Sequence, residues 1–462
     1  MFFGFLAFVG VVGALVGLLL AFLSQRYWFA RAWRLAARVE RAEWRKRFRG
    51  ALIAVVAAVA LVALAGLVRN FRGTISRGSW WIAFFGLWLA SSIFSYLFIK
   101  VVAAVEWLWR RFRSAPSTEP LVSTASPARS RAGAPAENIN ESRRHFFQSA
   151  GVIAGAIPFV SAAYGFTSER FRYDVREVEI HIANLAPALD GMRITQLSDI
   201  HIGSYMPVAQ VRRAVGLANE LQGDLAVVTG DFLTGRTDPL EDCITELSHL
   251  RAPLGVWGCN GNHEIYARAE AKAASLFQQF GMKLLRQENA ELQWRGSAFN
   301  LIGVDYQRQR DREGNPMPML RGMERLVRRD IPNILLSHNP NSFPRASELG
   351  VELTLAGHTH GGQVRVEILD HTWSPAEFLT PYVAGLYRRP LFAPSDLDDN
   401  EIAALHPASS LEPRASSIYV NRGLGTIGAP VRLGVPPEIT LVTLRRASRM
   451  LSGLQPLTPN LQ

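Results

Sequence analysis

Cysteine is the scarcest residue type in this chain, with only Cys243 and Cys259 among 462 residues. A fold held together by several disulfide bonds is therefore excluded. Charged residues are also few, at 19% against 48% hydrophobic residues, which predicts that part of the chain lies in lipid. Disorder over the whole length is excluded, because 25 Phe, 11 Trp and 10 Tyr can fill a large core. At about 150 residues per domain, the length predicts roughly three structural units.

Lysine is nearly missing from the second part of the chain, where only Lys272 and Lys283 follow residue 148. The net charge of +11 comes from the N-terminal third, because residues 1–148 hold 20 basic and 6 acidic residues, whereas the remainder holds 30 and 33. A C-terminal part with a slight negative charge does not offer the broad basic face that a nucleic-acid backbone needs. We therefore expect no nucleic-acid partner.

Long hydrophobic runs dominate the N-terminal third. Three of them are free of charge, at residues 1–23, 51–68 and 79–99, and each has about the 18–20 residues that a helix needs to cross a bilayer. Three such runs without a polar face disfavour the buried helices of a soluble protein. A fourth run, residues 145–168, is weaker and interrupted by Pro158. Lys100 lies at the end of a run, where it can reach the interface, so these helices resemble an anchor rather than a transporter or channel.

The loops between the runs predict the orientation. Residues 24–49 carry nine Lys or Arg, the next loop carries three, and the loop from Arg110 to Arg144 carries seven. Basic loops stay in the cytoplasm. The sequence therefore predicts a multi-pass cell-membrane protein with its N-terminus outside and everything after residue 168 on the outer, extracytoplasmic side.

Residues 115–140 are rich in Pro, Ser, Ala and Gly, which is typical of a flexible linker. The following Ser142-Arg143-Arg144-His145-Phe146-Phe147 resembles a twin-arginine export signal. Alternatively, the two arginines anchor a membrane helix on its cytoplasmic side, and both interpretations predict the same topology. The expected organisation is a membrane region with three transmembrane helices (1–113), a linker (114–141), a twin-arginine-like signal with a fourth helix (142–168), an exported domain (170–447) and a C-terminal tail (448–462).

Beyond Arg170, short apolar runs alternate with amphipathic stretches. We expect strands at 193–197, 224–229, 255–259, 299–304, 333–336 and 352–356, and helices at 208–221, 240–250, 265–280 and 319–329. Strand and helix alternation predicts an α/β layered domain.

Five of the expected strands end in residues that commonly bind metals. These ends are Asp199-Ile200-His201, Gly230-Asp231, Gly261-Asn262-His263-Glu264, Ser337-His338-Asn339 and Gly357-His358-Thr359-His360. Ligand sites of α/β sheets collect outside the carboxyl ends of the strands, and alternate residues of a strand project to one side. Each motif alone is commonly a turn, a helix cap or a surface histidine. Five of the ten histidines falling at such ends together favour a metal centre.

This set of motifs resembles the calcineurin-like metallophosphoesterase superfamily, over roughly residues 173–447. The runs "GHTHGGQ" and "NRGLGTIGAPVRLGVPPEITLVTL" are similar to the bacterial branch whose members carry transmembrane segments or a twin-arginine signal. The resemblance implies a four-layer αββα sandwich with two mixed sheets between helices. It also implies a metal-dependent phosphoric ester hydrolase.

The resemblance further implies the roles of single residues. Asp199, His201, Asp231 and His360 match one metal site, whereas Asp231, Asn262, His338 and His358 match the other, with Asp231 bridging both. His263 matches the catalytic histidine, which lies beside the metals. Imidazole and carboxylate ligands suit two divalent transition-metal ions such as Mn, Fe or Zn.

Several residues keep two interpretations. Glu264 either orients His263 or starts the following helix, where a negative charge is favourable. Gln363 either contacts substrate or is a strand residue without a role. Both cysteines are interpreted as core residues, and the segment 371–414 as a surface excursion near the mouth of the site.

The leading hypothesis is a membrane-anchored hydrolase of phosphodiester or pyrophosphate bonds in an envelope or lipid-linked substrate. The branch includes enzymes resembling UDP-diacylglucosamine pyrophosphatases, but this substrate inference is only an analogy of fold. A nuclease of the same superfamily is one alternative. A non-catalytic membrane scaffold with a vestigial hydrolase domain is the other, and it predicts the loss of at least one ligand.

Overall fold

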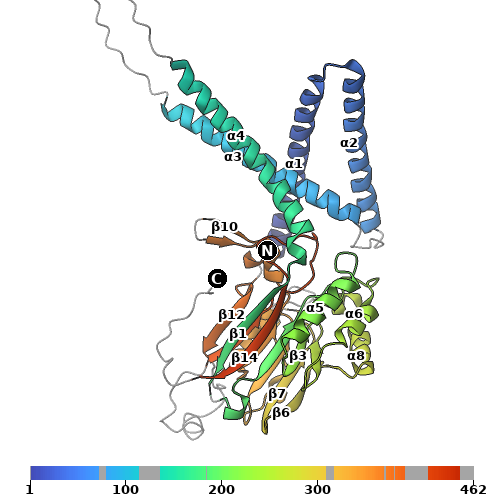
Figure 1. Ribbon diagram of the computed structural model, residues 1–462, viewed down its shortest axis with the longest axis vertical. Helices are drawn as coiled ribbons and strands as arrows, with labels where there is room; N and C mark the ends of the chain where they lie inside the picture. The colour runs from blue at the N-terminus through green and yellow to red at the C-terminus, as the bar shows by residue number, and fades with distance from the viewer. Residues whose placement is uncertain are drawn as a thin grey trace, which may run out of the picture. The chain divides into compact units, whose positions relative to one another are not determined.

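The computed structural model describes residues 2–71, 80–113, 136–183, 185–308, 317–368, 371–378, 380–390 and 415–447 (Figure 1). The chain forms two compact units. A helical unit comprises Met1–Ile75 and Trp81–Ala163, and an α/β unit comprises Ser76–Trp80 and Tyr164–Gln462.

The helical unit has four long helices, and each contains one of the four predicted apolar runs. They are α1 (Phe2–Ala37), α2 (Ala42–Phe71), α3 (Trp80–Arg113) and α4 (Ala136–Thr167). Within the described residues, two helical segments have the length and composition to cross a membrane, Ala83–Phe112 and Arg144–Phe171. Helix α4 begins at Ala136, inside the segment expected as a linker, whose remainder lies outside the described residues, as do residues 448–462. Four spans and their orientation stay predictions.

Hydroxyl groups of α3 join this helix to its neighbours in the helical unit. Ser95 Oγ donates to the backbone oxygen of Gly155 in α4 at 2.6 Å, and Ser92 accepts a hydrogen bond from Gln25 of α1 at 2.5 Å. Small residues permit this close approach, since a Cβ at position 155 would lie 2.9 Å from Ile99 Cδ1. Small and hydroxyl-bearing side chains are the usual contacts between membrane helices.

Two six-stranded mixed sheets form the centre of the α/β unit. The first sheet has the order β1-β14-β2-β3-β4-β5 and the second β12-β13-β9-β8-β7-β6. The strands of the first sheet are β1 (Asp174–Ile182), β2 (Arg193–Leu197), β3 (Leu225–Thr229), β4 (Val256–Cys259), β5 (Lys283–Leu284) and β14 (Glu438–Arg446). Those of the second are β6 (Glu288–Trp294), β7 (Ser297–Val304), β8 (Asn333–Ser337), β9 (Leu353–Ala356), β12 (Gly385–Pro390) and β13 (Ala415–Val420).

Helices cover the outer faces of both sheets. Helices α5 (Val208–Glu220), α6 (Leu240–Leu247) and α8 (Glu270–Gln279) lie against the first sheet (Figure 1). The short α9 (Phe343–Glu348) packs on the second sheet, where Ala346 joins the cluster around Ile302 and Leu335. The four-layer αββα sandwich implied by the family resemblance is confirmed.

Alternating side chains of the strands belong to two separate hydrophobic cores. In β3, Leu225 and Val227 point into the core between the sheets, whereas Ala226 and Val228 pack under the helices. Both faces of the strand are therefore buried, which explains its continuous apolar sequence. The sheets present their carboxyl-terminal strand ends at one edge, and this placement positions the site.

The helix expected at 319–329 is wrong. Only a three-residue 3₁₀ turn, Glu324–Leu326, forms there, because Leu320 and Gly322 have φ angles of 54° and 76°, which a right-handed helix excludes. The apolar spacing that suggested a helix instead serves burial, since Met319, Leu320, Met323 and Leu326 pack beside β7 and β8. The expected helix 265–280 forms as two, α7 (Asn262–Ala267) and α8, separated at Arg268 with φ 56°.

Part of the segment interpreted as a surface excursion belongs to the sheet structure. Strand β12 pairs antiparallel with β13 as an edge of the second sheet. Ahead of it, β11 (His371–Trp373) forms a two-stranded hairpin with β10 (Val366–Ile368), followed by a 3₁₀ turn, η6 (Pro375–Phe378). Residues 391–414 lie outside the described part of the chain.

Candidate metal centre

The predicted ligands follow strand ends and meet at one edge of the sandwich. Asp199 and Asp231 each come two residues after β2 and β3, and Asn262 begins α7 after β4. His338 directly follows β8, and His358 lies two residues after β9. His201 follows Asp199 by two residues, and His360 follows His358 by two residues. The structure brings all of these side chains together, while the assignment of ligand and catalytic roles stays a prediction.

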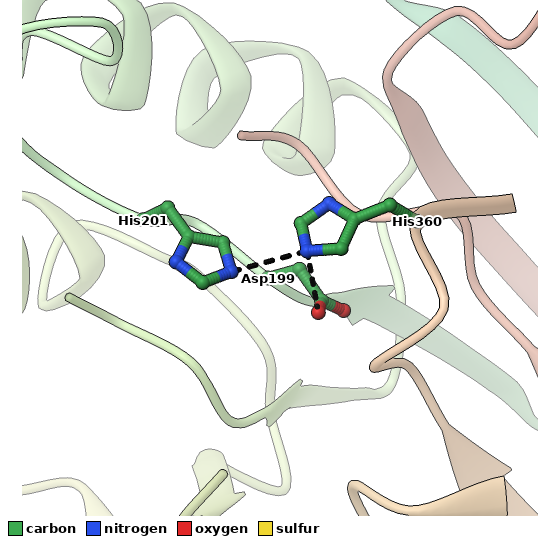
Figure 2. A group of neighbouring side chains, drawn as sticks. All are labelled: Asp199, His201 and His360. Carbon is green, nitrogen blue, oxygen red and sulfur yellow. Dashed lines mark hydrogen bonds and ion pairs between the residues drawn. The ribbon is translucent and has the colours of Figure 1, made fainter. Parts of the chain in front are cut away.

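One group consists of Asp199, His201 and His360 (Figure 2). His360 Nε2 lies 3.1 Å from His201 Nε2 and 3.3 Å from Asp199 Oδ1, and all three side chains are buried. Two imidazole nitrogens and a carboxylate oxygen pointing at one another are the donor set expected around a transition-metal ion.

Asp231 connects this group to a second one. Its Oδ2 lies 3.5 Å from His201 Nε2 and 3.1 Å from His338 Nε2. Asp231 also belongs to a cluster with His338 and His358 whose ligand atoms lie within 4.8 Å of one another. This position between the two groups fits the predicted bridging carboxylate.

Asn262 provides a test of whether a cation fits the second group. Its Oδ1 is buried and has no hydrogen-bond partner among the described residues, although an unpaired buried carbonyl oxygen is costly. A cation held by Asp231, Asn262, His338 and His358 would satisfy this oxygen. The donor chemistry and the unpaired atom therefore both fit divalent metal ions.

Backbone and hydroxyl oxygens orient the imidazole rings. His338 Nδ1 donates to Thr229 O at 2.6 Å, and His263 Nδ1 donates to Thr234 O at 2.8 Å. His201 Nδ1 lies 3.0 Å from Thr234 Oγ1. These bonds leave each Nε2 for the centre, as is usual for metal-binding histidines. Sequence reasoning missed both threonines, because neither belongs to a motif.

Electrostatics keep these histidines in different states. Burial lowers the pKa of His201 to about 3, which favours the neutral imidazole that metals bind. For His338, burial opposes the charged form, but the carboxylates of Asp231 and Asp199 outweigh it and raise its pKa to about 10. Burial raises the pKa of Asp199 to about 6. The carboxylates of Asp231 and Asp199 thus favour positive charge at the place where a cation would be held.

The ligand backbone is strained. Five of the seven predicted ligands have left-handed φ angles, at 49° for Asp199, 48° for His201, 55° for Asp231, 76° for His358 and 52° for His360. Such conformations cost about 1–3 kcal/mol each and persist where the surrounding structure enforces them. Here the enforcing bonds join neighbouring loops, with the N–H of Asp199 donating to Gly230 O and that of His201 to Asp231 O, both at 3.0 Å.

Glu264 fixes the loop that carries Asp231. Its buried carboxylate accepts four backbone N–H bonds, from Asp231 at 2.9 Å, Gly261 at 2.8 Å, Phe232 at 2.8 Å and Leu233 at 3.3 Å. The bond from Gly261 caps α7, as one interpretation expected, whereas the other three hold a loop that the sequence did not connect to Glu264. Burial raises the pKa of this carboxyl to about 7.

A glycine-rich loop after β13 supports Asp199 from the other side. The N–H of Gly425 donates to Asp199 O at 2.7 Å, and a Cβ at Gly423 would lie 2.5 Å from Asp199 Cβ. The buried guanidinium of Arg432 donates to the backbone oxygens of Arg422, Gly423, Gly425 and Val435. Glycine is required at 423 because both the close contact and its φ of 71° exclude larger residues.

A cavity of about 460 Å³ opens beside the centre. Asp231, His263 and His358 form one wall, and Tyr306, Asn341 and Thr380 are among the facing residues. Within the described lining there is no lysine or arginine, and metal ions at the centre would supply positive charge for a bound anion.

The structure also places Gln363 and the two cysteines. Gln363 lines the cavity, but its amide oxygen accepts from the N–H of Ile427 and its Nε2 donates to Ile427 O at 2.9 Å. It therefore holds a neighbouring loop. Cys243 and Cys259 are free and buried, as expected for core residues.

Known proteins resemble both units. Residues 192–362 match the family described as calcineurin-like phosphoesterase, and residues 12–170 match the probable calcineurin-like phosphoesterase, transmembrane domain. A transmembrane protein with metallophosphoesterase domain from Danio rerio is 28% identical over 64% of this chain, and the match spans 63% of that relative, less than two thirds. The counterpart from Bos taurus is 27% identical over 69% of this chain and 67% of the relative.

A bacterial relative matches over nearly its whole length. The uncharacterized metallophosphoesterase YkuE of Bacillus subtilis is 28% identical over 66% of this chain and 98% of its own. The two family matches cover successive parts of the sequence, and the second contains all five strand-end motifs. Residues 192–362 thus match the calcineurin-like phosphoesterase domain, and residues 12–170 match the transmembrane domain that accompanies it in this family.

Proposed function

We propose that this chain is a membrane-anchored phosphoester hydrolase that uses two divalent transition-metal ions. The observation that carries the proposal is the convergence of the predicted aspartate and histidine ligands in neighbouring clusters, together with the buried, unpaired Oδ1 of Asn262, which belongs to the lining of the same cavity. Asp199, His201, Asp231 and His360 would hold one ion, and Asp231, Asn262, His338 and His358 the other. Mn, Fe or Zn suits these donors.

Bound ions would activate water and neutralise the charge of the phosphoryl oxygens. The residues around them position substrate and protons. His263 Nδ1 carries its hydrogen towards Thr234 O, because a carbonyl oxygen can only accept. The other ring nitrogen, Nε2, is therefore the atom that takes up and releases a proton, and His263 can protonate the leaving oxygen.

The favoured substrates are phosphodiesters or pyrophosphates of envelope or lipid-linked molecules. A cavity lined by tyrosine, asparagine and threonine supports neutral polar substituents around one phosphoryl group at the centre. Its volume of about 460 Å³ is in the range of small-molecule sites. The resemblance to UDP-diacylglucosamine pyrophosphatases supports a lipid-linked substrate by analogy only.

The alternatives are less well supported. A vestigial scaffold predicts a lost ligand, and every ligand position is occupied by a residue of the matching type. A nuclease requires basic residues along the substrate path, and the described cavity lining offers none.

Hydrolysis by the full-length chain tests the proposal. Purified protein in detergent, supplied with Mn²⁺, is assayed with bis-p-nitrophenyl phosphate and p-nitrophenyl phosphate, and the variant Asp231→Asn serves as the inactive control. We expect metal-dependent release of nitrophenol from the diester that chelation abolishes. Absence of hydrolysis with Mn²⁺, Fe²⁺ and Zn²⁺ would contradict the proposal.

The α/β unit is proposed to lie on the outer side of the cell membrane. The transmembrane-domain match and the two candidate spans support the anchor, and the basic loops support the orientation. A reporter that works only outside the cytoplasm should be active after Gln462. The double variant Arg143→Lys, Arg144→Lys keeps the charge: retention in the cytoplasm identifies an export signal, whereas normal export identifies a helix anchor.

A further inference from the structure

Three large apolar side chains are exposed on one short segment of the α/β unit. Val366 of β10, Trp373 of β11 and Phe378 of η6 are 42%, 60% and 83% exposed, and we call them the hairpin surface. Figure 1 shows β10 beyond the ends of strands β1, β12 and β14. Exposed apolar residues scattered singly are ordinary, but a cluster containing Trp and Phe marks an interaction surface.

Elsewhere in the described α/β unit, exposed apolar residues are isolated. Tyr164 lies in α4, Val175 in β1, Tyr266 in α7, Phe280 at the end of α8 and Met317 in a loop. The hairpin surface therefore differs from the rest of the unit in how densely exposed apolar side chains follow one another along the chain.

The base of the hairpin lies beside the end of a candidate membrane span. That span ends at Phe171, and within the α/β unit the backbone oxygen of Gly165 accepts a hydrogen bond from the N–H of Arg432 at 3.3 Å. The contact is close, since a Cβ at Gly165 would lie 2.4 Å from Arg432 O.

Leu433, the next residue after Arg432, pairs with the residues that lead into β10. Leu433 accepts from the N–H of Arg365 at 2.8 Å and donates to Gln363 O at 2.8 Å. Val366, the first residue of β10, follows directly. These backbone contacts connect the residues that precede β10 to the last part of the candidate span.

The hairpin surface also borders the cavity. Ala376 of η6 and Thr380 line the cavity, and Thr380 Oγ1 donates to Asn341 Oδ1 at 2.7 Å. In addition, Ser374 Oγ lies 3.5 Å from Gly361 O, next to His360. The segment that exposes Trp373 and Phe378 is thus part of the cavity wall.

We propose that the hairpin surface inserts into the interfacial region of the bilayer, so that the cavity faces the lipid surface and receives the phosphodiester headgroup of a membrane lipid. Trp and other aromatic side chains prefer this interface, and partial insertion of apolar side chains is sufficient to seat a surface element. The choice of a lipid phosphodiester rests on the proposed function, whereas the insertion itself does not.

Insertion depth can be measured without any activity. Trp373→Cys in the full-length chain carries a nitroxide label, and Phe280→Cys is the matched control on an exposed aromatic position far from the cavity lining. Native Cys243 and Cys259 are fully buried and should remain unlabelled. The protein is placed in nanodiscs of phosphatidylcholine with phosphatidylglycerol, and relaxation by oxygen is compared with relaxation by a water-soluble nickel chelate.

We expect the label at position 373 to respond more to oxygen than to the nickel chelate, and the label at 280 to show the opposite preference. A label at 373 that matches the one at 280 would overturn insertion. A label at 373 shielded from both reagents would also overturn it, because protein rather than lipid would then cover the surface.

Hydrolysis assays test the lipid substrate separately from the insertion of the hairpin surface. For the variant Trp373→Ser, Phe378→Ser, kcat/KM on a phosphodiester lipid in the nanodisc should fall about tenfold, equivalent to about 1.4 kcal/mol, while hydrolysis of soluble bis-p-nitrophenyl phosphate stays within about twofold. Phe280→Ser should change neither. Equal losses on both substrates, or no loss on the lipid, would overturn the lipid-facing cavity. Absence of hydrolysis of either diester by the unaltered chain would instead contradict the proposed function, and the depth measurement would still decide insertion.

Discussion

The two units of this chain differ in the kind of polar residue that they bury. In the helical unit, hydrogen bonds between helices, such as that from the hydroxyl of Ser95 to the backbone oxygen of Gly155, use neutral groups. In the α/β unit, ionisable side chains including Asp199, Asp231 and Glu264 are fully or almost fully buried at one edge of the sandwich. Neutral contacts can be lost at little cost, whereas a buried charge deprived of its partners is expensive. Substitutions in the two units should therefore differ strongly in their effects.

The largest effect is expected for Asp231→Asn, because this carboxylate lies between both ligand groups. Losing one outer partner of a metal site already costs about 10–100-fold, so a ligand shared by two sites should cost more than about 10⁴-fold in turnover. Elemental analysis should find fewer than the two ions per chain expected for the unaltered protein. Retention of both ions with normal turnover would show that Asp231 does not bridge.

His263→Ala should reduce turnover by about 10²–10⁴-fold, the range for loss of a general acid or base. Its metal content should remain unchanged, because His263 is assigned to proton transfer rather than to either ligand group. Steady-state kinetics and elemental analysis on one preparation of the variant measure turnover and metal content together. Loss of metal would make His263 a ligand, and full activity would mean that the leaving group needs no proton from it.

Glu264→Gln should lower the free energy of unfolding by at least about 2 kcal/mol, since an amide cannot accept from all four N–H groups and each unpaired buried donor costs about 1–3 kcal/mol. Urea denaturation measures the change. Glu288→Gln, at an exposed position of β6, is the matched control. Equal unfolding midpoints for the two variants would show that the loop does not depend on the Glu264 carboxylate.

The smallest effect is expected in the helical unit. Ser95→Ala removes one neutral hydrogen bond to Gly155, and bonds of this kind between membrane helices average about 0.6 kcal/mol. Thermal unfolding in detergent should shift only slightly, with diester hydrolysis unchanged. A loss of stability as large as that of Glu264→Gln would contradict the predicted difference between substitutions in the two units.

The sequence predicts the strand ends well, because five buried strands are followed at once by polar residues of one chemical kind. Those side chains meet in the structure, and the assignment of their roles remains to be tested. Thr229 and Thr234 could not be found in this way, since they act mainly through backbone oxygens whose neighbours depend on the fold. The extra functions of Glu264 were hidden for the same reason.

The spacing of apolar residues predicted the long helices and also the shorter α5 and α6. The four long helices coincide with long hydrophobic runs. The short pattern at 319–329 instead reflected burial of an irregular segment, which left-handed residues such as Leu320 keep from becoming a helix. Contacts between the helices of the helical unit had no sequence signature, because single serines such as Ser95 recur without a period.

The left-handed backbone at Asp199, His201, Asp231, His358 and His360 limits how this centre can be rebuilt elsewhere. Grafting the seven side chains onto another α/β protein would place them on relaxed strand ends, where their Cβ atoms point in other directions. The transferable unit is each turn together with its bracing loop, including Gly423 and the carboxylate of Glu264. Protein engineers who borrow this site have to borrow its backbone as well.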